Sequence, residues 1–222
     1  MSAHEFGLFL FRWAHVLFGI VWIGMLYYFN FVQGEYFKEA TADAKSDAVQ
    51  KLAPRALWWF RWGAMFTFIT GFVLLLGMVK TSLINDMIVT GATLGTLMFL
   101  NVWLIIWPNQ QVVIGLKQGD KAIAGAKALL ASRTNVLFSA PMLFGMLAGP
   151  HGGGYTSQHL FAASGVSIGF WVVLAIIAAL EGNALIGKTG PMTTIKGVIH
   201  CSLALTAVLF GLLFFLGMAT PV

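Results

Sequence analysis

Histidines within apolar stretches are the residues of this chain best suited to chemistry. His15 lies in the apolar run of residues 7–32, and Gly19 and Trp22 follow it at spacings of four and seven residues. In a helix these three residues share one face. A glycine beside an imidazole leaves a flat space, in which a haem can approach the helix while the imidazole nitrogen binds iron. The alternative is a packing face on which His15 hydrogen-bonds to a neighbouring helix.

His200 has a similar setting in the apolar run of residues 192–218. Small residues surround it at helical spacing, namely Gly197, Ala204, Ala207 and Gly211. Such a stripe is equally typical of ordinary helix packing. His15 and His200 are expected at different depths, roughly 10 Å or more apart along the membrane normal, so one iron is not expected to join them. If both bind haem, two haems of b type would be stacked across the membrane.

Two further histidines, His151 and His159, lie in the glycine-rich segment GPHGGGYTSQH. Either could be a second axial ligand opposite His15, or could contact a metal or a substrate. The alternative is a solvated loop whose glycines turn the chain, and it is the favoured interpretation for His151. His159 begins the next helix and is the better candidate.

Three arginines could bind an anion near these helices. Arg12 precedes His15 by one turn and could pair with carboxylates of a cofactor or of a substrate at the outer surface. Arg61 and Arg133 are expected at the inner ends of their helices, where they could bind haem propionates or an anionic substrate. The alternative is that they extend to lipid headgroups and set the orientation in the membrane.

The elements that must position these residues are membrane-spanning helices. Of the 222 residues, 59% are hydrophobic and 9% are charged, against about 25% charged in an ordinary soluble domain. This composition excludes a water-soluble fold. The single cysteine excludes a disulfide framework, a cysteine-based zinc site and a covalent c-type haem, which needs C-x-x-C-H. Lysines and arginines are spread over the connecting segments, so nucleic acid is not an expected partner.

We predict an all-α integral membrane helical bundle that forms a single domain over residues 1–222. At about 20 to 25 residues per helix, the chain has room for roughly six spans. They are expected at about 7–32, 58–79, 86–107, 135–148, 160–180 and 192–218. The polar segments 34–57 and 109–134 are predicted to form amphipathic helices at the membrane surface, with Pro54 ending the first. Pro141 is expected to keep the fourth span short or kinked.

The distribution of basic residues predicts the orientation. Lysines and arginines concentrate in the connections after the first, third and fifth spans. By the positive-inside rule these connections are cytoplasmic and both termini are periplasmic. The first span has neither a basic segment before it nor a small-residue cleavage site, so we expect it to be retained. The predicted location is the bacterial inner membrane.

Four segments together resemble a known family. They are FRWAHVLFGIVWIG, WWFRWGAMFTFITGFVLL, IIWPNQQVVIG and SRTNVLFSAPMLFGMLAGPH. In this order they resemble the membrane domain of the bacterial urate oxidase N-terminal family, the membrane urate hydroxylases linked to a cytochrome c domain. The first segment is also similar to other small membrane haem proteins, including the copper-resistance and protoporphyrinogen-oxidase-like families.

The resemblance implies a membrane oxidoreductase that takes electrons from urate or a similar organic substrate and passes them to a c-type cytochrome. The residues of this chain that match the family's pattern are His15, Gly19, Trp22, Arg133, Asn135 and the turn at residues 108–110. The sequence has no C-x-x-C-H, so a separate cytochrome or a larger membrane complex is the expected partner.

Urate or another small anion would meet either the outer or the inner arginines. We expect the outer group, Arg12 with residues 151–159. The connection at residues 80–85 is too short for an extramembrane substrate domain. The alternative function is therefore a non-catalytic membrane anchor or assembly subunit of a respiratory or monooxygenase complex.

Overall fold

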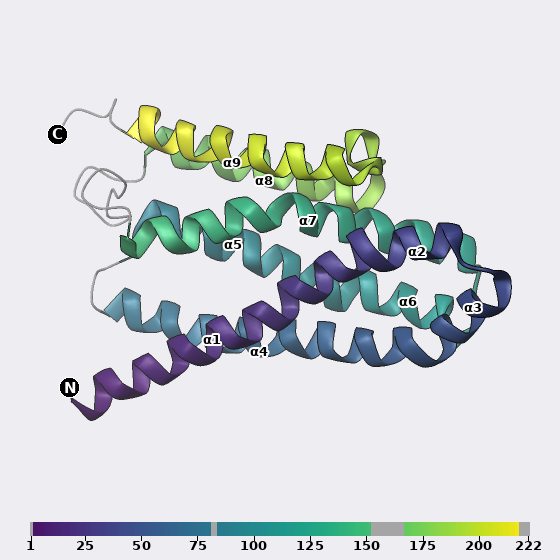
Figure 1. Cartoon of the computed structure of the whole chain (residues 1–222). Coiled ribbons are helices and arrows are strands. Elements are labelled where there is room, and N and C mark those ends of the chain that lie inside the picture. Colours follow the sequence, from purple (N-terminus) through teal and green to yellow (C-terminus); the bar gives the residue numbers. More distant parts are fainter. Residues whose placement is uncertain (1, 81–83, 152–166, 218–222) are drawn as a thin grey trace.

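The computed structural model describes residues 2–80, 84–151 and 167–217, and these residues form helices without any β-strand. Figure 1 shows long helices running side by side, with the start of α1 and the end of α9 at the same end of the bundle. The all-α prediction is confirmed. Within the described residues, five helical segments are long and apolar enough to cross a membrane: Ala3–Glu39, Ala42–Val79, Asp86–Val113, Ile168–Ile186 and Ile195–Leu216.

The first span is longer than predicted. Helix α1 (Ala3–Tyr27) begins with a capping box, in which the Ser2 hydroxyl accepts from the backbone of Glu5 and the Glu5 carboxylate accepts from the backbone of Ser2. The helix continues through the π-helical segment η1 (Tyr28–Gln33) into α2 (Gly34–Glu39). The residues predicted to begin a separate surface helix therefore extend the first span.

The second span also takes in part of the predicted surface helix. After a break at residues 40–41, α3 (Ala42–Asp47) is capped by Thr41 and continues through the π-helical segment η2 (Ala48–Leu52) into α4 (Ala53–Lys80). We expected Pro54 to end a helix, but it lies in the first turn of α4. The helical segment Ala42–Val79 continues through this position, directly after the π-helical turns of η2.

The third span matches its prediction and then extends beyond it. Helix α5 (Asp86–Leu100) is capped by the Asn85 side chain, which accepts from the backbone N–H of Ile88. It continues through the π-helical segment η3 (Asn101–Ile106) into α6 (Trp107–Val113). The predicted end at residue 107 is therefore a change of helix type in one continuous helical segment.

The fourth helix corrects two predictions. Residues 121–134 were expected at the membrane surface and residues 135–148 in a short span, but both belong to one 31-residue helix, α7 (Lys121–His151). Pro141 does not end it. The missing N–H of Pro141 would leave the Leu137 carbonyl without its helical partner, and the Ser202 hydroxyl of α9 donates to that carbonyl at 2.8 Å.

The remaining spans are α8 (Ile168–Ile186), capped by Ser167, and α9 (Ile195–Gly217), which follows the 3₁₀ turn η5 (Gly190–Thr193). The predicted fifth span began at residue 160, but residues 152–166 lie outside the described part of the chain. Its end is later than the predicted residue 180, because α8 continues for six residues beyond that position.

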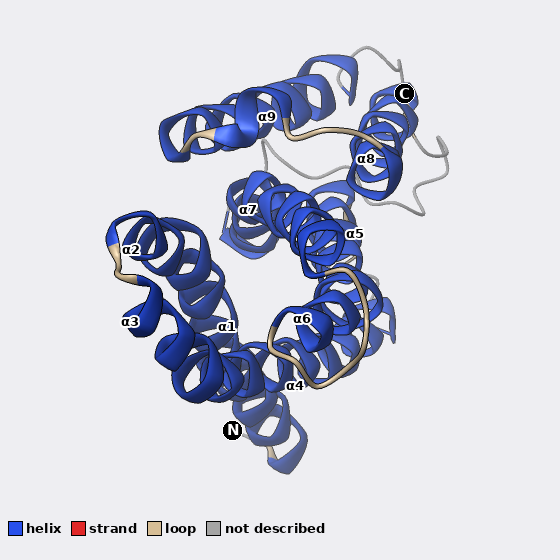
Figure 2. Ribbon diagram, turned by 90° about the vertical axis from the view of Figure 1, so that its right-hand side faces the viewer, coloured by secondary structure: helices blue, strands red, loops and turns tan. Residues whose placement is uncertain are grey.

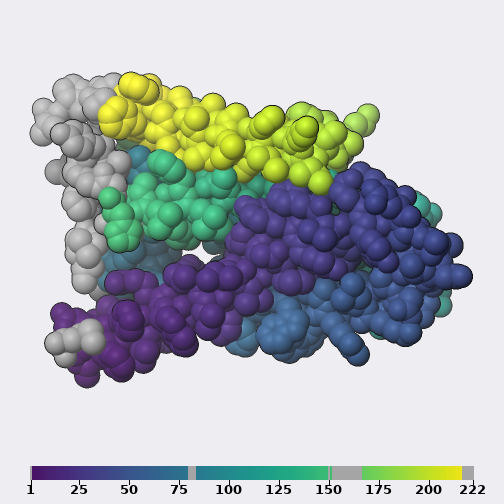
Figure 3. Space-filling view, viewed as in Figure 1, coloured from purple at the N-terminus to yellow at the C-terminus, as the bar shows by residue number. Residues whose placement is uncertain are grey.

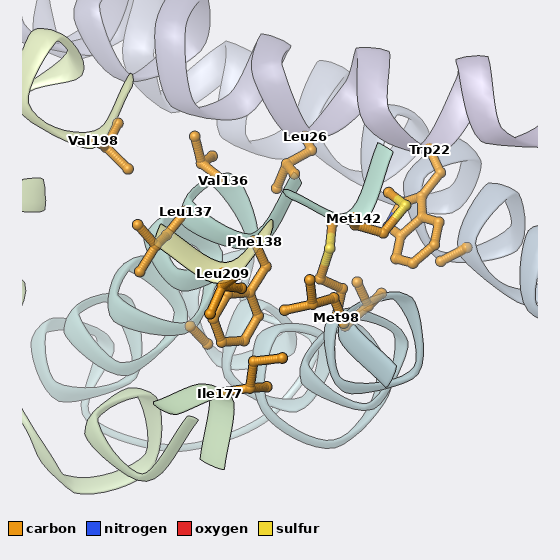
Figure 4. Packing of buried hydrophobic residues seen from close by; sticks show 14 of the residues in the cluster. Trp22, Leu26, Met98, Val136, Leu137, Phe138, Met142, Ile177, Val198 and Leu209 are labelled. Carbon is orange, nitrogen blue, oxygen red and sulfur yellow. The ribbon is translucent and has the colours of Figure 1, made fainter. Parts of the chain in front are cut away.

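Helix α7 is the centre of the bundle. It packs along α5 and is covered by α8 and α9, while α1 packs along α4 (Figure 2). Figure 4 shows Trp22 and Leu26 of α1 gathered with Met98 of α5 and Met142 of α7 in the buried core. Helix α7 is not among the five apolar segments, since polar residues occupy buried positions at its middle: Arg133, Thr134, Asn135 and Ser139.

Candidate functional site

His15 lies where α1 packs on α4, and two contacts fix its ring. Its Nδ1 is 2.9 Å from the Thr67 carbonyl oxygen and 3.1 Å from the Thr70 hydroxyl. A carbonyl only accepts, so Nδ1 carries the proton and donates to it. In the neutral imidazole Nε2 then holds a free lone pair, and it has no hydrogen-bond partner among the described residues.

Glycine on α4 makes room for this ring. A Cβ atom at Gly71 would lie 2.8 Å from His15 Cε1, closer than real Cβ contacts come, and 3.2 Å from Nδ1, a tight contact. Gly19, predicted to form the flat space beside His15, has only one neighbouring atom within reach of a Cβ, Thr67 Cγ2 at 4.0 Å. Trp22 is buried, and its Nε1 has no hydrogen-bond partner in the described residues.

These contacts suit an iron ligand. A histidine that binds a metal usually donates its other ring N–H to a carbonyl, which fixes both the tautomer and the ring orientation. His15 has this arrangement. Figure 3 shows an opening between the first half of α1 and the neighbouring helices, so the side of α1 away from α4 is not fully covered. The residues present therefore fit one axial ligand of a haem, with Nε2 of His15 as the donor.

No second ligand lies beside His15 in the described part of the chain. His200 is exposed on α9, and His151 is exposed at the last position of α7. His159 lies outside the described residues. Among the described residues, there is no cluster of three or more histidine, cysteine or acidic residues that could hold a metal ion.

The structure separates the three arginines. Arg12 is exposed on α1. Arg61 stacks on the Trp107 ring, with its guanidinium carbon 3.8 Å from the ring centroid, so α4 and the start of α6 are joined by a cation–π contact. Arg133 is only 6% exposed, at the middle of α7. The inner pair, Arg61 and Arg133, therefore differ in environment: one covers an aromatic ring and the other is enclosed by protein.

A buried polar centre surrounds the segment 132–135 of α7. On one side, Asn30 of η1 donates to the Ser132 hydroxyl at 2.7 Å. On the other side, Asn101 of η3 donates to the Asn135 side-chain oxygen at 3.0 Å and to the Glu181 carboxylate of α8 at 3.1 Å. Nothing in the sequence indicates that Asn101 and Glu181 meet Asn135.

Two of the three π-helical segments in the described residues, η1 and η3, place asparagines against α7. π-Helical turns are rare and occur often at functional sites. Here η1 and η3 each present a buried asparagine, and these two asparagines contact the first and last residues of the Ser132–Asn135 segment. The polar centre therefore joins three of the membrane-spanning helical segments to α7.

The Asn135→Leu variant should lower the free energy of unfolding by about 1–3 kcal/mol, because it removes the buried acceptor of an Asn101 side-chain N–H and the hydrogen bond from Asn135 to the Met98 carbonyl. Thermal unfolding of the purified protein in detergent measures this. In the Asn101→Leu background the same substitution should lower the free energy of unfolding by less, since the bond between Asn101 and Asn135 is already lost. Equal costs in both backgrounds would contradict the contact.

One family model matches part of the chain. The model of the urate oxidase N-terminal family matches residues 81–184, which confirms the resemblance over that region. The matched region contains the IIWPNQQVVIG and SRTNVLFSAPMLFGMLAGPH segments and hence the Ser132–Asn135 segment and Glu181. The segments around His15 and Arg61 precede it. No curated protein and no solved structure matches the chain.

Proposed function

From the match of residues 81–184 to the urate oxidase N-terminal family, we propose that this chain is a membrane redox protein of the urate-hydroxylase type. It binds a b-type haem through His15, takes electrons from an organic substrate such as urate, and passes them to a c-type cytochrome or a larger membrane complex. The observation that carries the haem assignment is the fixed ring of His15, whose Nδ1 donates to the Thr67 carbonyl and leaves Nε2 free.

The residues around His15 prepare it for this role. The Thr70 hydroxyl lies 2.7 Å from the Phe66 carbonyl oxygen and 3.0 Å from the Thr67 carbonyl oxygen and can donate to either, so its own helix helps to fix its position. The backbone and hydroxyl of α4 then hold the imidazole in one tautomer. When bound, the haem would supply one-electron chemistry, and the protein supplies the ligand, its orientation and an apolar surrounding.

We also propose an orientation in the bacterial inner membrane. The basic residues of α2, α3 and the connection between α6 and α7 lie at the opposite end of the bundle from the start of α1 (Figure 1). By the positive-inside rule this basic end faces the cytoplasm. The first turns of α1 and the last turns of α9 are then periplasmic, where soluble c-type cytochromes accept electrons.

The optical spectrum tests the haem assignment. Protein purified after expression with haem supply should show a Soret band and an α band that sharpens on reduction with dithionite. The His15→Ala variant should lose these bands, because the iron loses its fixed ligand. The His200→Ala variant is the matched control and should keep them, since His200 is exposed on a different helix.

Other outcomes would change the proposal. A colourless wild-type protein, expressed with ample haem, would contradict it. Loss of about half of the haem in His200→Ala would instead support a second haem. Reduction of the bound haem on addition of urate, followed anaerobically at the α band, tests the substrate.

A further inference from the structure

A surface pocket lies on the outer side of α4, at its first turns. The pocket has a volume of about 360 Å³ and is lined by four residues of this helix: Pro54, Arg55, Trp58 and Trp59. On the same turns, Ala56, Leu57 and Phe60 are buried in the bundle. The pocket therefore opens away from the other helices, towards the surroundings of the protein.

Two indole rings form an aromatic corner in this pocket. The ring centroids of Trp58 and Trp59 are 5.0 Å apart, and the ring planes meet at 85°. The two residues are 45% and 58% exposed, so a ligand can reach them from outside. An indole combines an apolar ring with an N–H donor, and tryptophan is therefore enriched where a membrane meets water. The corner suits a ligand that is partly apolar and partly polar.

Arg55 supplies the charge of the pocket. Its side chain is exposed and forms no ion pair within the part of the chain that the structure describes. Lys51, one turn earlier, pairs with Asp47 instead. Arg55 is the only ionised residue that lines the pocket, so the pocket is positively charged. A guanidinium binds the oxygens of a phosphate group through paired N–H donors.

The pocket lies at the depth expected for phospholipid headgroups. From Trp58 to Val79, α4 rises about 32 Å at 1.5 Å per residue, close to the roughly 30 Å of the hydrocarbon core of a bilayer. Arg61 is the only charged residue in this stretch, and it stacks on Trp107. Trp58 therefore marks one boundary of the hydrocarbon core. Arg55, nearly one turn earlier, is at the level of the phosphate groups.

An apolar stripe continues from the pocket along the same side of α4. Ile69, Phe72 and Leu76 are each about half exposed, and helical spacing places them on the side of Trp58. The acyl chains of a phospholipid held in the pocket would lie along this stripe. A free phosphate ion has no apolar part that could use it. The stripe therefore favours a lipid as the occupant.

We propose that the pocket of Pro54, Arg55, Trp58 and Trp59 binds the headgroup of an anionic phospholipid, with the lipid phosphate on Arg55 and the glycerol region against the two indoles. A zwitterionic headgroup would bring an ammonium group close to the Arg55 guanidinium, and no carboxylate lines the pocket to pair with it. An anionic headgroup avoids this repulsion. The bound lipid would hold the start of α4 at a fixed depth in the membrane.

Native mass spectrometry of the full-length protein in detergent, titrated with 1-palmitoyl-2-oleoyl-phosphatidylglycerol, measures the affinity for the first bound lipid. The Arg55→Gln variant removes the charge of the pocket, so its affinity should fall about fivefold. The matched control is Lys117→Gln, which removes one exposed charge outside the pocket, in the connection between α6 and α7. Its affinity should equal that of wild type.

A second pair of variants tests the aromatic corner. Trp59→Leu stays apolar but removes one wall of the pocket, so it should also bind phosphatidylglycerol more weakly than wild type. Trp171→Leu is its control, because Trp171 is 60% exposed on α8, outside the pocket. Its affinity should be unchanged. If Arg55→Gln does not fold, as judged by gel filtration, the comparison of Trp59→Leu with Trp171→Leu still decides whether the pocket binds the lipid.

Three results would overturn the proposal. Equal affinity of wild type and Arg55→Gln for phosphatidylglycerol would show that the lipid binds elsewhere. Equal affinity of wild type for phosphatidylcholine with the same acyl chains would exclude a preference for anionic headgroups. Displacement of phosphatidylglycerol by an excess of inorganic phosphate would show that the phosphate group alone is recognised. Weaker binding in both pocket variants, with unchanged binding in both controls, supports the site.

Discussion

The Gly145→Ala variant should unfold at a clearly lower temperature than the wild-type protein. A Cβ at position 145 would lie 2.7 Å from the Met87 carbonyl oxygen and 3.0 Å from both Cα and N of Gly91. These are backbone atoms of α5, so no side chain can move aside to relieve the contact. The two helices must separate instead, which costs about 1–3 kcal/mol as overpacking.

The close crossing of α5 and α7 depends on a pair of glycines, Gly91 and Gly145. A Cβ at Gly91 would in turn lie 2.9 Å from the backbone nitrogen of Met146. Close approach of two helices through small residues is typical of membrane bundles, in which association depends on packing. The Gly91→Ala variant should therefore be destabilised to a similar extent, and the double variant by less than the sum, because a single separation relieves both contacts.

Thermal unfolding in detergent, followed by gel filtration with fluorescence detection, measures both variants. The control is Gly182→Ala on α8, where a Cβ meets nothing within 4 Å. That variant should be as stable as wild type or slightly more stable, because alanine favours a helix more than glycine does. If Gly145→Ala unfolded at the same temperature as Gly182→Ala, the close crossing of α5 and α7 would be wrong.

The Gly71→Ala variant should lose most of the bound haem although every proposed ligand remains. The new Cβ would lie 2.8 Å from Cε1 of His15 and must displace the ring. Displacement breaks the bond from Nδ1 to the Thr67 carbonyl and moves Nε2 from its fixed position. A ligand that has lost its orientation typically loses 10–100-fold in metal affinity.

Haem content per protein, from the pyridine haemochrome spectrum, measures this effect. The control is Gly24→Ala on α1, where a Cβ meets nothing within 4 Å, and its haem content should equal that of wild type. Full haem content in Gly71→Ala would exclude His15 as the ligand, provided that the variant elutes as a folded protein. Because His15 is still present in Gly71→Ala, a loss of haem in this variant would result from the changed orientation of the ring.

The polar segments show where sequence reasoning failed. Charged residues among apolar ones at 109–134 are typical of a helix on a membrane surface, and we assigned them so. In the structure, the second part of this segment is the first half of α7. Its alanines at 124, 128 and 131 are buried against neighbouring helices. Hydropathy cannot distinguish a helix at a lipid surface from one that is covered by protein, because both tolerate polar residues.

Contacts between residues on different helices could not be predicted from the sequence either. The sequence placed His15 beside Gly19 and Trp22 on one helix, but the glycine that its ring touches is Gly71 of α4. Likewise, the sequence shows the Ser132–Asn135 segment as part of a motif but does not predict its contacts with Asn30 and Asn101, or the bond from Asn101 to Glu181. These contacts depend on how the helices cross.

Composition and the lengths of the apolar runs by themselves determined that this is an all-α protein with membrane-spanning helices, because a lipid surrounding requires long apolar helices that satisfy their own backbone. They also located His15 within the first of these helices. Tertiary structure alone decided that Thr67 and Gly71 fix the His15 ring, that α7 lies at the centre of the bundle, and that Arg133 is buried at the middle of α7. The periodicity of a sequence specifies the faces of a single helix, whereas the neighbours of each face are set by packing between helices.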